Sequence, residues 1–339
     1  MLLRVTSRVL RAELEHRAVT TNGIRLHCVV AGSGPLVVLL HGFPEFWYSW
    51  RHQIPALVAA GFRVAAPDLR GYNESDKPEG VEAYRMSELV ADVAGLIRAL
   101  GEERAVIVGH DWGGALAYAF AMLHPEMTTR LAVLNCPHPD IFGRAVTLGD
   151  MEQMKKSWYM FFFQLPLLPE ALLAANNFKL LKQFAYANSR RGTFSRRDLA
   201  RYFEAFGKPG ALTGAINWYR AMFRRPQGGR AYPKIAAPTL VIWGTADHFL
   251  GARLLRGMTR HFAGPFKLVR LPGVSHWVQQ EAPRRVNELL LRFLCSGVRE
   301  PATGEGGLRQ KRMAPARATG EGGLRRRRAA PTRRRPGAR

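Results

Sequence analysis

Residues 108–114 read "VGHDWGG", at the end of the apolar run "RAVIVG" (104–109) and the start of the small-residue run "GGALAYAFAM" (113–122). A strand followed by a helix, with small residues at the junction, predicts a sharp turn that presents Asp111 at its tip. Serine is the usual nucleophile at such a turn, so a carboxylate here requires a chemical explanation. An aspartate at this position can also serve simply as the N-cap of the helix.

The segments around this turn alternate between strand-like and helix-like patterns. From residue 35 onward, short β-rich apolar runs follow helical patterns such as "MSELVADVAGLIRAL" (86–100), which predicts βαβ units and a mostly parallel sheet. The fold class is therefore α/β. We expect strands at 35–40, 62–67, 104–109, 130–135, 238–244 and 266–271.

Residues 138–230 interrupt this alternation. They contain helical, aromatic-rich pieces such as "SWYMFFFQLPLLPEALLAANNF" and no strand-like run. We therefore expect an all-helical cap between two strands, over the carboxyl ends where open α/β sheets bind ligands. The core then comprises 20–137 and 231–297, preceded by an N-terminal extension at 1–19. The apolar piece is too short and too rich in proline to span a membrane.

Of the formal net charge of +24, +10 lies in residues 301–339 and +14 on the first 300 residues. Residues 301–339 hold twelve Lys and Arg against two Glu, and "ATGEGGLR" occurs twice, at 302–309 and 318–325. A segment with so few large apolar residues cannot offset its ordering entropy by burial, so we expect a disordered basic tail at 298–339. Two interpretations stay open: an electrostatic tether to nucleic acid or anionic lipid, and a solvated extension without catalytic consequence.

The cysteines and the N-terminus bear on the compartment. Cys28, Cys136 and Cys295 are far apart, odd in number and without metal-like spacing, which favours a reducing environment. The segment "MLLRVTSRVLRAELEHR" carries charges every few positions, so it lacks a signal-peptide core. We predict a cytoplasmic protein without a membrane span, metal or cofactor. The oligomeric state stays open.

Two later residues complete a catalytic set around Asp111. In a fold of this kind an acid and then a histidine follow the nucleophile along the chain. "VIWGTADHFL" (241–250) supplies Asp247 after a strand, and "LPGVSHWVQQEAP" (271–283) places His276 after the last predicted strand. We therefore predict Asp111 as nucleophile, His276 as general base and Asp247 as the acid that orients the histidine.

Backbone N–H groups near the turn predict an oxyanion hole. One comes from Trp112, the residue after the nucleophile, and the other from Phe43 in "LLHGFPEFW" (39–47). Pro44 is expected to hold that turn rigid. Asp68 in "PDLRG" precedes the nucleophile, so we expect it to hold its own loop by hydrogen bonds.

The carboxylate of Asp111 determines whether an acyl carbon or a saturated carbon is the better target. Its conjugate acid has a pKa of about 3.9, so it is a weak acyl nucleophile, and its attack on acyl carbon gives an anhydride. At a saturated carbon the same displacement gives an ordinary alkyl ester, whose aspartyl carbonyl can be attacked by water that His276 activates. Two leaving groups stay open at this point: an epoxide oxygen and a halide.

With these motifs in place, the sequence resembles the α/β-hydrolase-fold epoxide hydrolases of the soluble type over about 20–297. The resemblance lies in "HGFPEFWYSWRHQIPALVAAGFRVAAPDLRGYNESDKP", "VGHDWGGALAYAFA", "WYMFFFQLP", "INWYRAMF", "WGTADHF" and "LPGVSHWVQQEAP". It implies the α/β-hydrolase fold with a helical cap before the acid-bearing strand. It also implies that an epoxide becomes a vicinal diol through a covalent alkyl-aspartyl ester, with Tyr159 and Tyr219 donating protons to the epoxide oxygen. A phenol with a pKa of about 10 suits that task.

Four aromatic residues near these motifs are expected to line the substrate pocket: Trp47, Phe161, Phe163 and Trp218. Such a lining favours a lipophilic epoxide, so the expected partners are that epoxide and water, with no obligatory nucleic acid.

Two alternative functions stay open. Haloalkane and haloacid dehalogenases also resemble this chain and use the same Asp–His–Asp set, although Phe43 lacks the side-chain donor that many of them have there. The other alternative is a binding protein on a hydrolase scaffold whose basic tail dominates its function.

Overall fold

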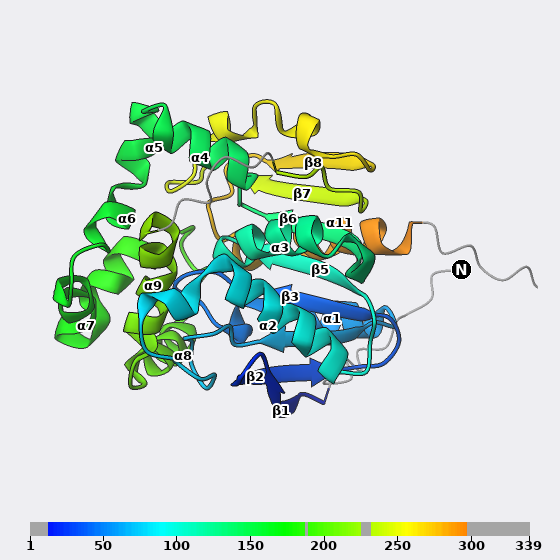
Figure 1. The fold of residues 1–339 in the computed structure, drawn as a ribbon, viewed down its shortest axis with the longest axis horizontal. Coiled ribbons are helices and arrows are strands. Elements are labelled where there is room, and N and C mark those ends of the chain that lie inside the picture. The colour runs from blue at the N-terminus through cyan, green and yellow to red at the C-terminus, as the bar shows by residue number, and fades with distance from the viewer. Residues whose placement is uncertain (1–12, 187–188, 225–231, 297–339) are drawn as a thin grey trace, which may run out of the picture. The chain divides into compact units, whose positions relative to one another are not determined.

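The centre of the computed structural model, which describes residues 13–186, 189–224 and 232–296, is one eight-stranded sheet (Figure 1). The strands lie in the order β1-β2-β4-β3-β5-β6-β7-β8. β2 is antiparallel to both β1 and β4, and all the other neighbouring strands are parallel. Their bounds are β1 (Glu15–Thr21), β2 (Ile24–Ala31), β3 (Leu36–Leu40), β4 (Arg63–Pro67), β5 (Ala105–His110), β6 (Thr128–Leu134), β7 (Thr239–Gly244) and β8 (Phe266–Leu271).

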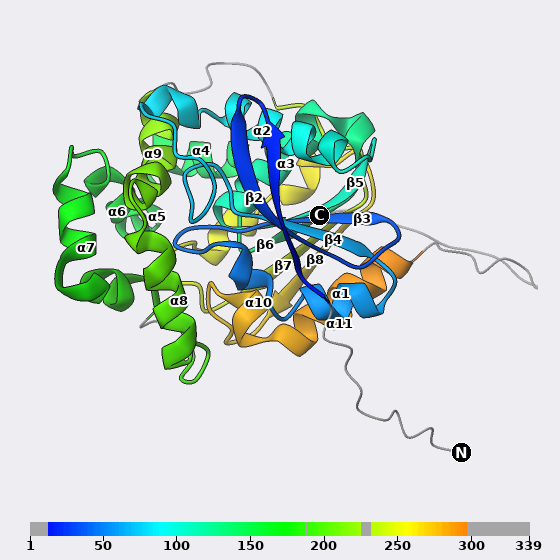
Figure 2. The same ribbon diagram turned by 90° about the horizontal axis from the view of Figure 1, so that it is seen from below.

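Helices cover both faces of the sheet. Figure 2 shows α2 and α3 over one face and α1 and α11 over the other. Every residue of β3, β5 and β7 is buried, as expected for parallel strands that are covered on both sides. The bounds are α1 (Ile54–Ala59), α2 (Met86–Ala99), α3 (Trp112–Leu123), α10 (Val278–Glu281) and α11 (Pro283–Cys295), with 3-10 turns at Trp47–Trp50, Val81–Tyr84, Pro125–Met127, Ala252–Leu255 and Met258–His261.

The cap consists of helices that the chain inserts between β6 and β7. Figures 1 and 2 agree that α5 to α9 gather at one side of the sheet. The bounds are α4 (Pro139–Thr147), α5 (Met151–Lys156), α6 (Trp158–Phe162), α7 (Leu168–Leu181), α8 (Arg196–Gly207) and α9 (Ala211–Arg224), with a π-helical turn at Lys182–Tyr186. The backbone of α7 is not helical at 175–178, so α7 is two helical pieces joined by a kink.

The sheet agrees with the six predicted strands to within two residues at each end. It also contains the hairpin of β1 and β2, which we did not expect. The extension that we expected at 1–19 therefore ends inside a strand, because β1 begins at Glu15 and pairs along its whole length with β2. The boundary expected at residue 230 and the tail expected at 298–339 lie outside the described residues.

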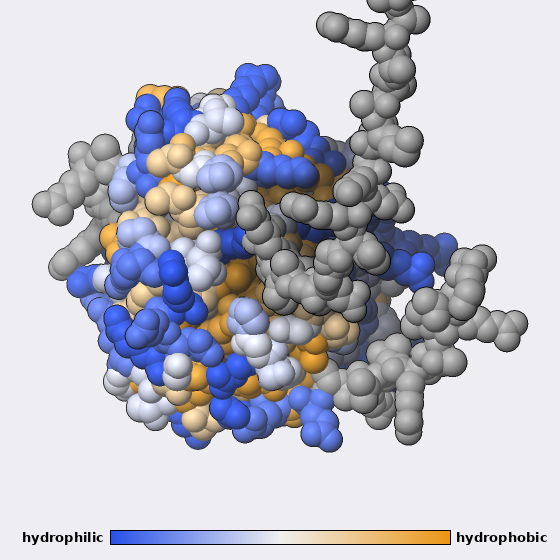
Figure 3. Space-filling model, turned by 90° about the vertical axis from the view of Figure 1, so that its right-hand side faces the viewer, coloured by the Kyte–Doolittle hydropathy of each residue, from blue (hydrophilic) through white to orange (hydrophobic). Residues whose placement is uncertain are grey.

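No helix in the described ranges is long and apolar enough to cross a membrane. Figure 3 shows the side of the molecule that faces away from the cap, where hydrophilic and apolar residues are interspersed.

Candidate active site

Asp111 occupies a sharp turn between β5 and α3. Its backbone has φ 52° and ψ −120°, in the left-handed half of conformational space that non-glycine residues rarely adopt. The turn is tight because α3 lies close to the strands: a Cβ on Gly109 would be 2.1 Å from the carbonyl oxygen of Gly113, and one on Gly113 would be 2.1 Å from that of Leu40. A reactive side chain on a strained backbone is typical of a functional turn.

The two carboxylate oxygens of Asp111 have different surroundings. Oδ1 accepts a hydrogen bond of 2.9 Å from the backbone N–H of Phe43, whereas Oδ2 lies 3.5 Å from Nε2 of His276. Gly42 allows this approach, because a Cβ there would lie 2.5 Å from Asp111 Cβ. The side chain of Asp111 keeps 14% of its surface exposed, so Oδ1 is held by the protein while the carboxylate stays accessible.

Phe43 and Trp112 supply backbone donors beside this carboxylate. The Phe43–Pro44 peptide bond is cis, and the N–H of Phe43 already donates to Asp111. Trp112 is the first residue of α3, and backbone N–H groups in the first turn of a helix have no intrahelical acceptor. Both N–H groups therefore come from positions suited to stabilising negative charge on an oxygen of Asp111.

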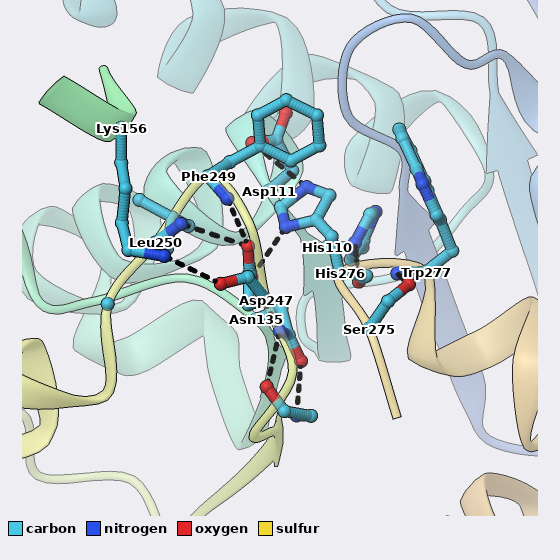
Figure 4. Close-up of polar contacts among 12 residues, drawn as sticks. His110, Asp111, Asn135, Lys156, Asp247, Phe249, Leu250, Ser275, His276 and Trp277 are labelled. Carbon is cyan, nitrogen blue, oxygen red and sulfur yellow. Dashed lines mark hydrogen bonds and ion pairs between the residues drawn. The ribbon is translucent and has the colours of Figure 1, made fainter. Parts of the chain in front are cut away.

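His276 lies between two carboxylates (Figure 4). Its Nδ1–H donates to Oδ2 of Asp247 at 2.7 Å, and this bond leaves Nε2 facing Asp111. His276 and Asp247 are buried. The structure thus brings the three residues of the predicted Asp–His–Asp set together from three separate loops.

Asp247 is held by four hydrogen bonds. Its Oδ1 accepts from the backbone N–H groups of Phe249 and Leu250, and its Oδ2 accepts from Nδ2 of Asn135 as well as from His276. Asn135 follows β6, and its Oδ1 accepts from the N–H of Gly244 at the end of β7. Asn135 therefore joins two strand ends to the acid, a role that its sequence position did not reveal.

The three groups shift one another's ionisation. Burial favours the neutral form of Asp111, but the hydrogen bond and charge of His276 outweigh burial and lower the pKa of Asp111 below its ordinary 3.8. Burial also favours the neutral form of Asp247, but the positive charge of His276 outweighs burial and lowers the pKa of Asp247 below its ordinary value. Burial alone would lower the pKa of His276, but Asp247 and Asp111 raise it to about 10. At neutral pH the resting site therefore holds two carboxylates and one imidazolium.

Tyr159 of α6 and Tyr219 of α9 are buried and line the same cavity as Asp111 and His276. Their ring centroids are 5.8 Å apart. Burial raises the pKa of both phenols well above 10, and the negative charge of Asp111 adds to the shift in each case. Both phenols consequently keep their protons at neutral pH and can donate them to a stronger base in the cavity.

The cavity over Asp111 is enclosed by aromatic side chains from the cap and the core. Its lining residues are Phe43, Pro44, Asp111, Tyr159, Phe184, Ala185, Tyr219, Phe249, His276 and Trp277. Phe184 and Ala185 come from the π-helical turn of the cap, and Phe249 and Trp277 come from the loops that carry Asp247 and His276. Phe184, Phe249 and Trp277 were not expected from the sequence.

Three of the four expected pocket residues lie elsewhere. The ring of Trp47 packs against His16 and Phe46. Phe161 is 42% exposed on the outside of the cap. Trp218 donates its indole N–H to the carbonyl oxygen of Arg70 and lines a separate small cavity beside α2.

Phe163, the fourth expected residue, is buried one layer behind the cavity wall. Its ring meets the rings of Phe43 and Tyr219 edge-on, with centroids 5.6 and 5.0 Å away. It supports two lining residues and does not itself line the cavity.

A buried polar network lies behind the turn. His110 directs Nδ1 at a carboxylate oxygen of Glu45, at 2.8 Å, and Nε2 at the carbonyl oxygen of His276, at 2.9 Å. Gln279 and Gln280 also donate to Glu45. This network fixes the backbone of His276 from behind and links it to the loop that carries Phe43.

Asp68 has the structural role that we expected. Its carboxylate accepts from the backbone N–H of Trp47, from Nδ2 of Asn73 and from the ring of His27. These bonds tie the loop after β3 to the loop after β4.

Across the described ranges, no group of three or more His, Cys, Asp or Glu is arranged to hold a metal ion.

Comparisons with known proteins agree with this geometry. A family model described as alpha/beta hydrolase fold matches residues 35–283. The AB hydrolase superfamily protein YfhM of Bacillus subtilis (strain 168) is 45% identical over 278 residues, which cover 81% of this chain and 96% of that protein. Epoxide hydrolase 4 of Mus musculus is 40% identical over 280 residues, 80% of this chain and 77% of its own. The crystal structure of an epoxide hydrolase from Bacillus megaterium in complex with an inhibitor has a TM-score of 0.77 and 32% identity, covering 82% of this chain and 99% of that one. This chain therefore belongs to the α/β-hydrolase fold family and, within it, to the epoxide hydrolases.

Proposed function

We propose that this chain hydrolyses a lipophilic epoxide to a vicinal diol through a covalent ester on Asp111. The observation that carries the proposal is the asymmetry of that carboxylate. Oδ1 is bound by the N–H of Phe43, while Oδ2 faces His276, in a cavity that two protonated tyrosines line. The apolar side chains of Phe184, Phe249 and Trp277 support a lipophilic substrate.

In the first step, Asp111 opens the ring. Oδ2 attacks an epoxide carbon, the carbon–oxygen bond of the ring breaks, and its electron pair goes to the ring oxygen. Tyr159 and Tyr219 are placed to protonate that oxygen, because an alkoxide is a stronger base than even a phenolate whose pKa is raised by burial. The step leaves an alkyl ester on Asp111 and one tyrosinate.

In the second step, His276 activates water. Once Asp111 is esterified, the histidine has lost one of the two carboxylates that raise its pKa, so its proton can return to the tyrosinate. Neutral His276 then takes a proton from water, and the hydroxide attacks the carbonyl carbon of the ester. Negative charge develops on Oδ1, toward the N–H groups of Phe43 and Trp112.

Collapse of this intermediate completes the cycle. The diol oxygen leaves and takes the proton from His276. Asp111, now carrying one oxygen from water, gives its acid proton back to His276 and becomes a carboxylate again. The resting ion pair of Asp111 and His276 is restored, and no atom or charge is left over.

A single turnover in ¹⁸O-water, with enzyme in excess over styrene oxide, tests this route. The first diol should contain no label, because its new oxygen comes from Oδ2 of Asp111, and the label should appear in the Asp111 peptide by mass spectrometry. Label in the first diol at once would show that water attacks the epoxide directly. Asp111→Ala, which removes the nucleophile, serves as the inactive control.

The halide alternative is tested with the same protein. The related proteins described above are named epoxide hydrolases, and a pair of buried phenols suits an oxygen leaving group better than a halide. Halide release from a bromoalkane at a rate that rivals styrene oxide opening would assign the chain to dehalogenation instead. A cytoplasmic location and independence from any cofactor remain predictions from the sequence.

A further inference from the structure

The outside of the cap exposes a group of large apolar side chains that the active site does not use. Within the described ranges, every exposed large apolar residue except Leu14 and Leu123 lies between 148 and 180. We call the central part of this group the apolar cap surface. It consists of Trp158, Phe161, Leu165, Leu167, Leu168 and Leu172.

The spacing of these residues places them on the exposed faces of two consecutive segments, α6 with the turn after it and the first half of α7, which together we call the strip. Trp158, Phe161 and Leu165 follow one another at intervals of three and four residues along α6 and the turn after it, and Leu168 and Leu172 are one turn apart on α7. Leu167 lies between the two sets with 80% of its surface exposed. Figures 1 and 2 both show α6 and α7 at the outer end of the cap, away from the sheet.

Burial in the cap or the substrate cavity does not account for this strip. The neighbours of these residues in the sequence, Tyr159 and Phe163, turn inward and are buried, whereas Trp158 is 56% exposed. Monomeric proteins seldom leave so many large apolar side chains together in water, and such patches usually mark an interaction site.

Three exposed lysines flank the strip in the sequence. Lys155, near the end of α5, lies three residues before Trp158, and Lys179 and Lys182 lie seven and ten residues after Leu172. No carboxylate among the described residues lies within ion-pair distance of any of them. The two glutamates of 151–182 already pair with arginines. This part of the cap therefore exposes large apolar side chains together with lysines that no carboxylate of the described residues pairs with.

We propose that the apolar cap surface docks on the interface of an anionic lipid bilayer. Leucine, phenylalanine and tryptophan side chains would enter the boundary between headgroups and acyl chains, and the lysines would meet lipid phosphates. This is docking on a surface and not insertion across the bilayer, in keeping with the lack of a spanning helix among the described residues.

The positive charge near the strip favours an anionic lipid surface over two other possible partners, a second copy of the chain and the basic segment 301–339. A second copy of the chain would bring the same three lysines against each other across a symmetric contact, where like charges repel. The segment 301–339 offers arginine, glycine and proline but only Leu308, Met313 and Leu324 as large apolar side chains. An anionic bilayer complements both features of the strip at once.

A vesicle-binding assay with the full chain tests the docking. We would compare vesicles of phosphatidylcholine with vesicles of phosphatidylcholine and phosphatidylglycerol by co-sedimentation. Wild type should bind the anionic vesicles, and the double variant Leu167→Ser/Leu168→Ser should bind them at least about tenfold more weakly, because two inserted side chains are lost. Leu123→Ser is the matched control: this leucine is 59% exposed on the core, outside the strip, and its loss should leave binding unchanged.

Two further comparisons distinguish docking by the strip from attraction by the basic segment and from self-association. The basic segment 301–339 can by itself attract anionic vesicles, but it is intact in both leucine variants. Equal binding by the double variant and wild type would therefore overturn the proposal. A dimer in analytical ultracentrifugation that the double variant loses, together with no vesicle binding by wild type, would make the strip an interface between copies.

Vesicle binding is measured independently of epoxide chemistry. Binding is scored by sedimentation, so a wild type that binds vesicles but opens no epoxide would contradict the proposed function and leave the docking intact. Conversely, turnover of styrene oxide with no vesicle binding would remove only the docking. The double variant should retain turnover of styrene oxide in vesicle-free buffer, because neither leucine lines the cavity over Asp111.

Discussion

Gly42→Ala should disable Asp111 without replacing any reacting group. Gly42 lies in the loop after β3, and an added Cβ would come within 2.5 Å of Asp111 Cβ, 2.6 Å of its Oδ1 and 2.9 Å of the carbonyl oxygen of His110. Ordinary contact begins at 3.4 Å, so Asp111 and the loop would have to separate by about 0.9 Å. The obstacle is backbone and a Cβ, not the end of a flexible chain that could turn aside.

The consequence for catalysis follows from that displacement. The hydrogen bond from Phe43 to Oδ1 is 2.9 Å long, and a shift of about 0.9 Å along it would exceed hydrogen-bond range. A misplacement of about 1 Å costs on the order of 10²-fold in rate when the geometry of attack is lost. We therefore expect kcat/KM to fall by about 10²-fold, with a cost in folding stability of about 1–3 kcal/mol from overpacking.

Single-turnover kinetics with styrene oxide would measure the loss. Thermal melts show whether the variant is folded at the assay temperature. Gly143→Ala is the matched control, since a Cβ on this α4 glycine meets nothing within 4 Å, and it should retain wild-type kinetics. A folded Gly42→Ala protein with wild-type kcat/KM would refute this expectation, because Asp111 would then be free to relax without penalty.

Three further outcomes follow from the site. His276→Gln should open the ring but not hydrolyse the ester, so mass spectrometry should find the Asp111 peptide heavier by the mass of one substrate molecule. An unmodified peptide after incubation would contradict this. Tyr219→Phe should slow single-turnover ring opening about 10²-fold, and an unchanged rate would assign the proton to Tyr159 alone. Because the pKa of His276 rises from 6.5 in the unfolded chain to about 10 in the folded one, its stabilising contribution is complete below about pH 6.5 and is lost as the pH rises through about 10. Urea titrations should show the free energy of unfolding falling over that window, with a shallower fall in His276→Gln; parallel curves would assign the loss to other groups.

The sheet was predictable where its strands are buried on both faces. Runs such as β3 and β5 are apolar throughout and stand out from their flanks. β1 was not predicted because it begins with charged and polar residues and has most of one face exposed. A usable signal was nevertheless present: Asn22 and Gly23 both have positive φ, at 46° and 73°, and the pair Asn-Gly is the strongest short-range sign of a two-residue hairpin.

The site was predictable to the extent that chain order determines it. Asp111, Asp247 and His276 follow strands whose carboxyl ends meet at one edge, so their positions along the chain are enough to bring them together. Pocket lining depends instead on how the cap helices are rotated. Phe161 and Phe163 are two residues apart at the end of one short helix and face opposite ways, so only the packing of α6 decides which one turns inward.

In the proposed mechanism, one proton passes between a core residue, His276, and a tyrosine of the cap. Asp111 and His276 form an ion pair at rest, and ring opening removes the negative member of that pair while it creates a tyrosinate in the same cavity. The imidazolium and the new phenolate are thus generated together, and transfer of the proton between them makes the base for the second step without exchange with solvent. A histidine that starts protonated is therefore compatible with a general base that is needed only after the ester has formed.

Ester hydrolysis should consequently depend little on buffer concentration in the wild type. In Tyr219→Phe, the phenolate has to form on Tyr159 alone. Internal proton transfer therefore stays possible in that variant, and its ester breakdown should also depend little on buffer. In Tyr159→Phe/Tyr219→Phe no phenolate can take the proton from His276, so added buffer base should accelerate breakdown of any ester that forms, and stopped-flow measurements at several buffer concentrations would detect the difference. Equal buffer dependence in wild type and the double tyrosine variant would place the proton exchange in solvent.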